Sequence, residues 1–203
     1  MGTRDGAFGM EPIGLLGGRV FAGAFRHMRI VSAYNTNIFK GDNVHLVANG
    51  VIQRLTITAA GIPVGIFMGC SYTDATLGSV QRAHWPANQV ATDAVAYVCD
   101  DPWALFKIQA DATMANTDIG LNAAMINTVG STATGVSKNE LDAGGGTAPG
   151  TSSLLPLRII DFLDPGEIDS DFPIMLVKWN NGSAPTASAS GHQYNQALAL
   201  DVT

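Results

Sequence analysis

Histidine spacing is the first test for catalytic or metal-binding chemistry in this chain, and it indicates neither. None of the four histidines has another histidine or a cysteine at the short spacing of a zinc site; they are His27, His45, His84 and His192. We therefore predict no metal site among them and expect ordinary polar residues at the surface. Cys70 and Cys99 each lie within an apolar run, which favours buried, reduced thiols over a disulfide.

Carboxylates cluster at two places, and a turn explains the first. Asp100 and Asp101 stand before Pro102. Neighbouring side chains of a strand point to opposite faces, so these two carboxylates would not form a catalytic pair. An aspartate that accepts backbone N–H bonds beside a proline is typical of a turn. We also predict a turn at Asp42, which follows Gly41.

The second cluster is an acidic segment, residues 164–171. Its carboxylates are Asp164, Glu167, Asp169 and Asp171. Carboxylate oxygens are ligands for Ca²⁺. However, the alternating acidic residues, central glycine and terminal glutamate of a calcium-binding loop are absent. The pattern favours a solvated acidic loop, with Ca²⁺ binding as the alternative.

No motif predicts an enzyme. The sequence lacks a Gly-x-Ser-x-Gly nucleophile motif, a phosphate-binding loop and a dinucleotide-binding fingerprint. Neither Ser71 nor Cys70 has a base nearby in the sequence that would mark it as a nucleophile. We therefore predict no catalytic residues, no cofactor and no metal. Trp85 and Trp103 lie near turns, where they could stack on sugar rings or pack in a core or an interface.

Short apolar runs between Gly, Pro, Asn and Asp dominate the chain, a pattern typical of strands and turns. The predicted strands are residues 28–33, 44–47, 51–57, 64–72, 94–99, 105–110, 155–162 and 174–179. Asn49-Gly50, between two of them, predicts a hairpin with a type I′ turn, in which both central residues need positive φ. No segment shows a long apolar stripe of helical period. The predicted fold class is mainly β, a small β-barrel or β-sandwich.

Composition divides the chain into an extended N-terminal arm, residues 1–27, and a single β-rich domain, residues 28–203. Within the domain, residues 130–153 are predicted to form a long, mobile Gly/Ser/Thr-rich loop, and residues 182–203 a C-terminal tail. The arm mixes apolar side chains with arginine, residue types that are enriched at interfaces. Its candidate interface residues are Arg4, Phe8, Ile13, Leu15, Leu16, Arg19, Phe21 and Phe25. The alternative is an N-terminal strand folded onto its own domain.

Composition and charge exclude several classes of protein. At 46% hydrophobic residues, the chain of 203 residues is too apolar to be disordered. Its net charge of −6 argues against nucleic-acid binding, which relies on cations. No run reaches the roughly 18–20 apolar residues that span a bilayer, so we expect no membrane partner. Only 14% of the residues are charged, which predicts a surface of small polar residues or one partly covered by a partner.

Several stretches of the chain carry a resemblance to a known family. They are residues 39–42, 62–74, 84–86, 96–102, 106–109, 130–137, 155–158 and 192–195, which together span most of residues 13–195. Taken together, these stretches resemble small virion structural proteins of tailed bacteriophages, particularly marine ones. They are stretches of pattern, such as His84-Trp85-Pro86, and not catalytic signatures.

The resemblance implies a capsid decoration (cement) protein on the outer surface of the virion, assembled in the host cytoplasm. It implies the major capsid protein as a partner and a homo-oligomer, often a trimer, and it supplies no active-site residues. An acidic body suits the outside of the shell, because it gains nothing from the packaged DNA. The alternatives are a protein of the head-fibre base, collar or tail, and a carbohydrate-binding module on the virion surface.

Overall fold

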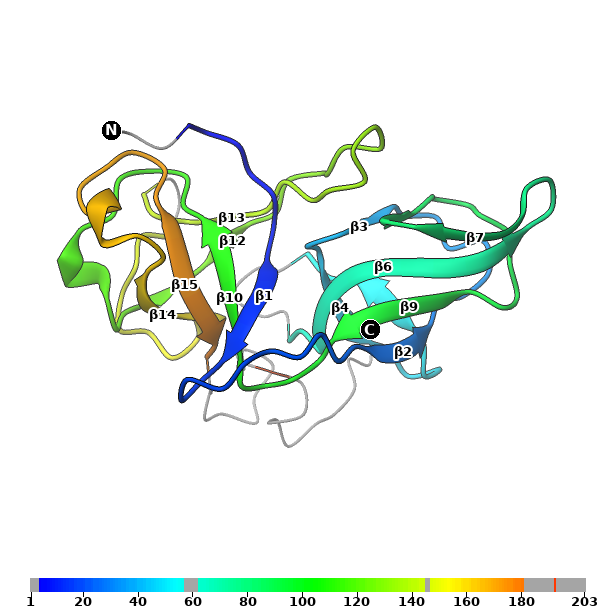
Figure 1. The fold of residues 1–203 in the computed structure, drawn as a ribbon, viewed down its shortest axis with the longest axis horizontal. Helices are drawn as coiled ribbons and strands as arrows, with labels where there is room; N and C mark the ends of the chain where they lie inside the picture. Colours follow the sequence, from blue (N-terminus) through cyan, green and yellow to red (C-terminus); the bar gives the residue numbers. More distant parts are fainter. Residues whose placement is uncertain (1–3, 57–61, 145–146, 181–191, 193–203) are drawn as a thin grey trace.

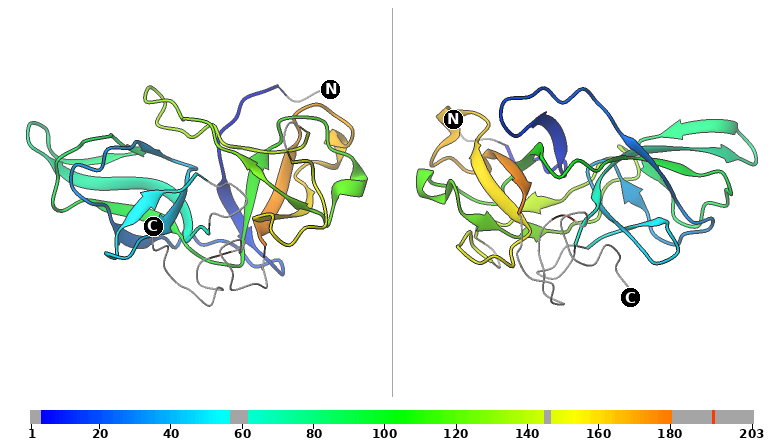
Figure 2. Two further views of the ribbon diagram at one scale, coloured as in Figure 1. Left: turned by 180° about the vertical axis from the view of Figure 1, so that it is seen from behind. Right: turned by 90° about the horizontal axis from the view of Figure 1, so that it is seen from below.

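Two β lobes lie side by side in the computed structural model, which describes residues 4–56, 62–144, 147–180 and 192 (Figure 1). Each lobe is built on one antiparallel sheet. Lobe A has the strand order β1-β10-β15-β14-β11, and lobe B has β2-β9-β6-β4-β5 with β7 paired to β6. The chain begins in lobe A, crosses to lobe B and returns at β10, so each lobe combines distant parts of the sequence (Figure 2).

Lobe A consists of short strands, with two single-turn 3-10 helices between them. Besides its main sheet, the lobe contains the strand pair β12–β13. Its elements are β1 (Glu11–Leu15), β10 (Ala104–Gln109), η1 (Asn116–Asp118), β11 (Asn122–Ala123), β12 (Met125–Ile126), β13 (Glu140–Leu141), β14 (Leu157–Phe162), η2 (Pro165–Glu167) and β15 (Ile174–Trp179). Among the described residues, no helix is long and apolar enough to cross a bilayer.

Lobe B is organised around β6, which pairs with β4, β7 and β9. A single isolated bridge between Ile30 and Ile52 joins the two ends of its main sheet, so the sheet curls without a continuous ladder that would close a barrel. The strands are β2 (Arg26–Arg29), β3 (Ile38–Phe39), β4 (Asn43–Leu46), β5 (Ile52–Arg54), β6 (Gly65–Asp74), β7 (Gly78–Arg82), β8 (His84–Trp85) and β9 (Val95–Cys99).

Alternating residues give the sheet of lobe A an apolar inner face. In β10, Phe106 and Ile108 are buried, while Lys107 between them is partly exposed. Val177 of β15 stands opposite Phe106. The Phe106 and Trp179 rings meet edge-on with their centroids 5.5 Å apart. Because side chains alternate across a strand, the period-two pattern places one set of residues in the core and the other outside.

The hydrophobic cores of the two lobes adjoin each other. The core of lobe A includes Leu55, Ile66 and Cys99, which come from lobe B segments. The core of lobe B surrounds Trp85, whose ring packs edge-on against Tyr72 at a centroid distance of 5.2 Å. The lobes therefore share buried apolar surface in addition to the chain segments that connect them.

The predicted mainly-β fold is confirmed, and each predicted strand overlaps an observed one. The hairpin predicted at Asn49-Gly50 also forms, since β4 pairs with β5. Its predicted type I′ turn is wrong, because Gly50 has φ of +74° but Asn49 does not have positive φ. The Gly50 N–H donates to the Val47 carbonyl at 2.9 Å, so the turn comprises residues 47–50, and Gly50 at its end is the residue in the left-handed conformation.

Much of the predicted N-terminal arm belongs to the body. Residues 11–15 form β1, an edge strand of lobe A, and residues 26–29 form β2 in lobe B. Met10 is fully buried in the core of lobe A. The prediction of an extended arm is therefore wrong for these residues, and the alternative, an N-terminal strand folded onto its own domain, is confirmed. Residues 16–25, here called the connecting segment, cross between the lobes and are mostly exposed.

The predicted mobile loop at residues 130–153 is also largely built into the body. Val136 forms a bridge with Lys40, and the side chains of Ser137 and Asn139 are buried. The prediction is wrong for these residues because their backbone and side chains bond to lobe B. Parts of the predicted loop and tail lie outside the described residues, namely 145–146, 182–191 and 193–203.

A methyl group at Gly65 is expected to destabilise the contact between β6 and β9. A Cβ at this position would press on the Cys99 carbonyl group and lie 2.8 Å from Val98 Cγ1. Because backbone would have to move, Gly65→Ala should lower the free energy of unfolding by about 1–3 kcal/mol, measured by urea titration. In the control Gly14→Ala, the added Cβ meets only the Arg19 carbonyl oxygen, at 3.8 Å. Equal losses for both variants would contradict this packing.

Candidate functional site

Asp42 occupies a tight turn where the two lobes meet. Gly41, with φ of +93°, allows the chain to turn between β3 and β4. The Asp42 N–H donates to the Phe39 carbonyl, and the Phe39 N–H donates to the Asp42 carboxylate, both at 2.9 Å. The turn predicted for Asp42 is confirmed. Its carboxylate is fully buried.

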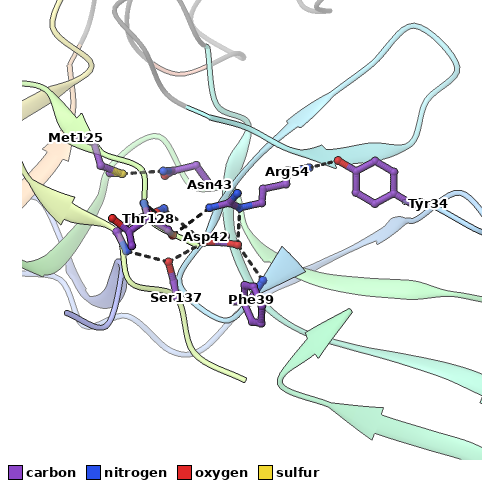
Figure 3. A network of polar contacts seen from close by, with 9 residues as sticks. Tyr34, Phe39, Asp42, Asn43, Arg54, Met125, Thr128 and Ser137 are labelled. Carbon is purple, nitrogen blue, oxygen red and sulfur yellow. Dashed lines mark hydrogen bonds and ion pairs between the residues drawn. The ribbon is translucent and has the colours of Figure 1, made fainter. Parts of the chain in front are cut away.

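The Asp42 carboxylate is the centre of a buried polar network (Figure 3). Arg54 Nε donates to Oδ2 at 2.9 Å. Ser137 Oγ donates to Oδ1 at 2.6 Å, and Asn139 Nδ2 donates to the same oxygen at 3.4 Å. Arg54 ends β5, whereas Ser137 and Asn139 precede β13. Donors from both lobes therefore satisfy the two oxygens of one carboxylate.

Arg54 extends the network to further segments. Its guanidinium donates to the Thr128 carbonyl at 3.2 Å, and its backbone N–H donates to Tyr34 Oη at 3.1 Å. Beside it, Asn43 Nδ2 donates to Met125 Sδ at 2.8 Å (Figure 3). The network thus joins residues of lobe B to the segment that contains β12 and β13 of lobe A.

Burial raises the pKa of the Asp42 carboxyl, while the Arg54 guanidinium and the hydrogen bonds from Ser137 and Phe39 oppose that rise. The Arg54 side chain is itself only 11% exposed. A buried ion pair contributes little net stability, whereas loss of one partner leaves an uncompensated charge and is costly. The pair therefore fixes the Asp42 turn against β5 within lobe B, and the Asp42 carboxylate offers no exposed surface to a substrate.

A backbone contact lies beside the network. The Gly9 N–H donates to the Asn139 carbonyl at 3.2 Å, and the Met10 N–H donates to the Gly41 carbonyl at 3.1 Å. A Cβ on Gly9 would lie only 2.6 Å from the Gly41 carbonyl oxygen. The N-terminal segment, the Gly41 turn and the Asn139 segment therefore converge at one place, and glycine is needed for their close approach.

The acidic residues singled out in the sequence mostly bind backbone groups or a cation. Asp101 accepts the Trp103 N–H at 2.8 Å, which confirms the predicted turn, and Asp100 pairs with Arg26. In the acidic segment, Asp164 and Glu167 each accept a backbone N–H at 2.8 Å. Within the described residues, no three potential ligands are grouped so that they could hold a metal ion.

Both cysteines and two of the four histidines are buried. Cys70 and Cys99 are free and buried, as predicted, and burial raises the pKa of each thiol to about 12. The prediction of surface histidines is wrong for His45 and His192, which are buried. His192 packs near the Trp179 ring, and burial lowers its pKa to about 4. Sequence spacing did not reveal this apolar environment.

The two tryptophans considered for sugar stacking do not form a shared platform. Trp85 is completely buried in lobe B, so its ring is inaccessible to a sugar. Trp103 is 47% exposed, and the Lys178 ammonium lies 5.6 Å from the centroid of its ring.

The candidate interface residues of the arm divide into two groups. Half-buried against their own body are Phe8, Leu15, Leu16 and Phe21. Exposed to solvent are Arg4, Ile13, Arg19 and Phe25. The Arg4 carbonyl accepts a hydrogen bond from Gln109 at the end of β10, whereas Phe25 directly precedes β2 in lobe B. The structure therefore does not gather these residues into one surface.

Val20 in the connecting segment is the most exposed large hydrophobic residue in the described part of the chain, at 84%. Phe25 is 37% exposed, and its ring centroid lies 5.8 Å from that of Phe21. The Leu15 N–H donates to the Arg19 carbonyl at 2.9 Å, so a turn holds the start of the segment.

Comparison of the chain with models of known protein families, with curated proteins and with solved structures finds no match.

Removing the cation of the buried pair should destabilise the protein. Arg54→Met leaves the Asp42 carboxylate without its ion-pair partner, so we expect the free energy of unfolding at neutral pH to fall by about 3–5 kcal/mol. The deficit should shrink as the pH falls toward 3.8, the ordinary pKa of an aspartate, because a carboxyl whose folded pKa is raised favours the folded state once protonated.

The matched control is Arg26→Met. Arg26 also pairs with an aspartate, Asp100, but its side chain is 62% exposed, so its loss should cost less than about 1 kcal/mol. Urea titrations of both variants at several pH values measure the difference. Equal costs, or a deficit for Arg54→Met that grows on acidification, would rule out the role assigned to the buried pair.

Proposed function

We propose that the chain is a non-enzymatic structural protein of a phage virion, which decorates the outside of the capsid as a homo-oligomer and stabilises it by binding the major capsid protein. The resemblance described above motivates the proposal. The observation that supports it is the exposed apolar connecting segment, which displays Val20 and Phe25 between the two lobes.

The connecting segment is suited to contact with another protein surface. Val20 and Phe25 offer apolar anchors, and Arg19 beside them is exposed. Aromatic residues and arginine are enriched at protein interfaces. The Leu16 N–H donates to the Trp103 carbonyl at 2.9 Å, which holds the segment at its start. An anchored segment loses less conformational entropy on binding than a free arm.

Weak contacts of this kind suffice when several act together. An oligomer that engages several capsid subunits at once gains effective concentration for each later contact. The low charge of the chain fits this role, since 14% charged residues leave much surface available for apolar and small polar contacts. Because its net charge is −6, the chain has no overall electrostatic attraction to packaged DNA, which is also negative.

We expect the purified chain to bind expanded phage heads that lack it and to raise the temperature at which they rupture. Co-sedimentation measures binding, and release of DNA or dye uptake during heating measures rupture. Heads that rupture at the same temperature with and without the bound chain would contradict the proposed stabilisation, and an absence of binding would contradict the proposed location.

The connecting segment can be tested with point substitutions. Deletion of residues 1–27 would also remove β1, so it would damage the fold. V20D/F25D should weaken binding to heads by at least about tenfold, since it places two charges in an apolar contact. The control Leu77→Asp changes a side chain that is 64% exposed in the turn after β6 and should bind normally. Equal binding by all three proteins would exclude the connecting segment as the contact.

A further inference from the structure

One end of the lobe A sheet carries two cations without a carboxylate partner. Arg158 of β14 and Lys178 of β15 stand directly opposite each other. Their strand neighbours Ile159 and Val177 are buried, so the two cations share the outer face. Like charges directly opposite each other on a sheet destabilise it. In the part of the chain that the structure describes, neither cation forms an ion pair.

The hydrogen bonds of this pair are all with neutral groups, and a carboxylate on the same face, Asp161, stands opposite Leu176, two positions along β15 from Lys178. Arg158 donates to Asn122 Oδ1 at 3.5 Å, and Lys178 donates to the Trp179 carbonyl at 3.0 Å. Burial lowers the pKa of Lys178, and the nearby Arg158 charge lowers it further. Lys107 lies on the same face but has a carboxylate partner, since its ammonium group forms an ion pair with Glu11 at 2.9 Å. We call Arg158 and Lys178 the cation patch.

The opposite end of the same sheet carries carboxylates, here called the carboxylate patch: Asp5, Asp111 and Glu140. Asp111 lies just beyond β10, and a bridge between Ala110 and Leu141 brings Glu140 beside it. The Gly6 N–H donates to Gln109 Oε1 at 2.8 Å, which places Asp5 at the same end. Burial raises the pKa of Glu140, and the charges of Asp5 and Asp111 raise it further.

The two patches cannot neutralise each other within one chain. Val177, next to Lys178, stands opposite Phe106 near the start of β10, whereas Gln109 ends the strand. A strand rises about 3.3 Å per residue, so the ends of β10 lie about 17 Å apart. This separation exceeds the distance of about 8–10 Å over which physiological salt screens charges.

We propose that the cation patch of one copy of the chain docks on the carboxylate patch of a second copy. The patches are complementary in charge, and each has an exposed apolar side chain nearby: Trp103 beside the cations and Leu163 just after β14 at the other end. Because the contact joins two different surfaces, repetition generates a ring where the rotation closes, or a filament where it does not.

This inference rests on one part of the proposed function, the homo-oligomer. Binding to capsids is a separate claim and has its own test. A chain that binds heads but shows no self-association would contradict the patch contact and leave the capsid proposal standing. A chain that self-associates through the patches but does not bind heads would do the reverse.

Charge reversal tests the contact by sedimentation velocity on the full chain. R158E/K178E and D111K/E140K should each raise the dissociation constant of self-association by about a hundredfold, because like charges then face each other across the interface. A one-to-one mixture of the two variants should associate again, since the native patch of each one matches the native patch of the other. The control R29E/R82E changes the net charge as R158E/K178E does, but lies outside both patches and outside the connecting segment, and it should associate as the wild type does.

Three results of the charge-reversal experiment would overturn the proposal. The first is a wild-type chain that is monomeric, and the second is a pair of variants that self-associate as the wild type does. The third is a pair of variants that do not self-associate separately and do not associate with each other when mixed. The wild-type chain gives an independent readout that needs no variant to fold. Its association should weaken as salt is raised, and association that is constant or stronger in high salt would also overturn the contact.

Discussion

The buried Asp42 carboxylate, whose hydrogen-bond donors come from lobe B and from the segment that leads into β13, is the group around which the contact between the lobes is built. A carboxylate with no exposed surface must receive its hydrogen bonds from the protein. Ser137 and Asn139 supply the remaining side-chain donors, so their segment has to lie against lobe B while β13, which follows it, pairs within lobe A. One charged group thereby sets the position of a long stretch of chain that composition alone describes as a loop.

Local pattern predicted the parts of the fold that local physics determines. β10 and β15 have clear period-two alternation, and Asp101 and Asp42 lie in turns that their own side chains stabilise. β1 was predicted only as the alternative to an arm, because Pro12 and Gly14 interrupt the pattern where the register with β10 shifts. The buried network was missed for another reason, since the Asp42–Ser137 bond joins residues 95 positions apart. No short-range signal in the sequence marks such a pair.

The proposed contacts use separate parts of the molecule, as expected of a protein that would link a capsid surface to further copies of itself. On this proposal, the exposed apolar side chains of the connecting segment contact the capsid, and the opposite charges at the two ends of the lobe A sheet contact further copies. The positions of the few charged residues then matter more than their number. Several charges pair within the body, as Glu11 does with Lys40 and Lys107, while those of the two patches do not pair with one another.

The central claim is that this chain sits on the outside of a phage capsid, and a cryo-electron microscopy map of the virion that contains it tests this most directly. The account predicts two-lobed density on the outer surface of the head, with the connecting segment, residues 16–25, against the major capsid protein. Density for the chain in the tail or collar, or only inside the shell, would contradict the account.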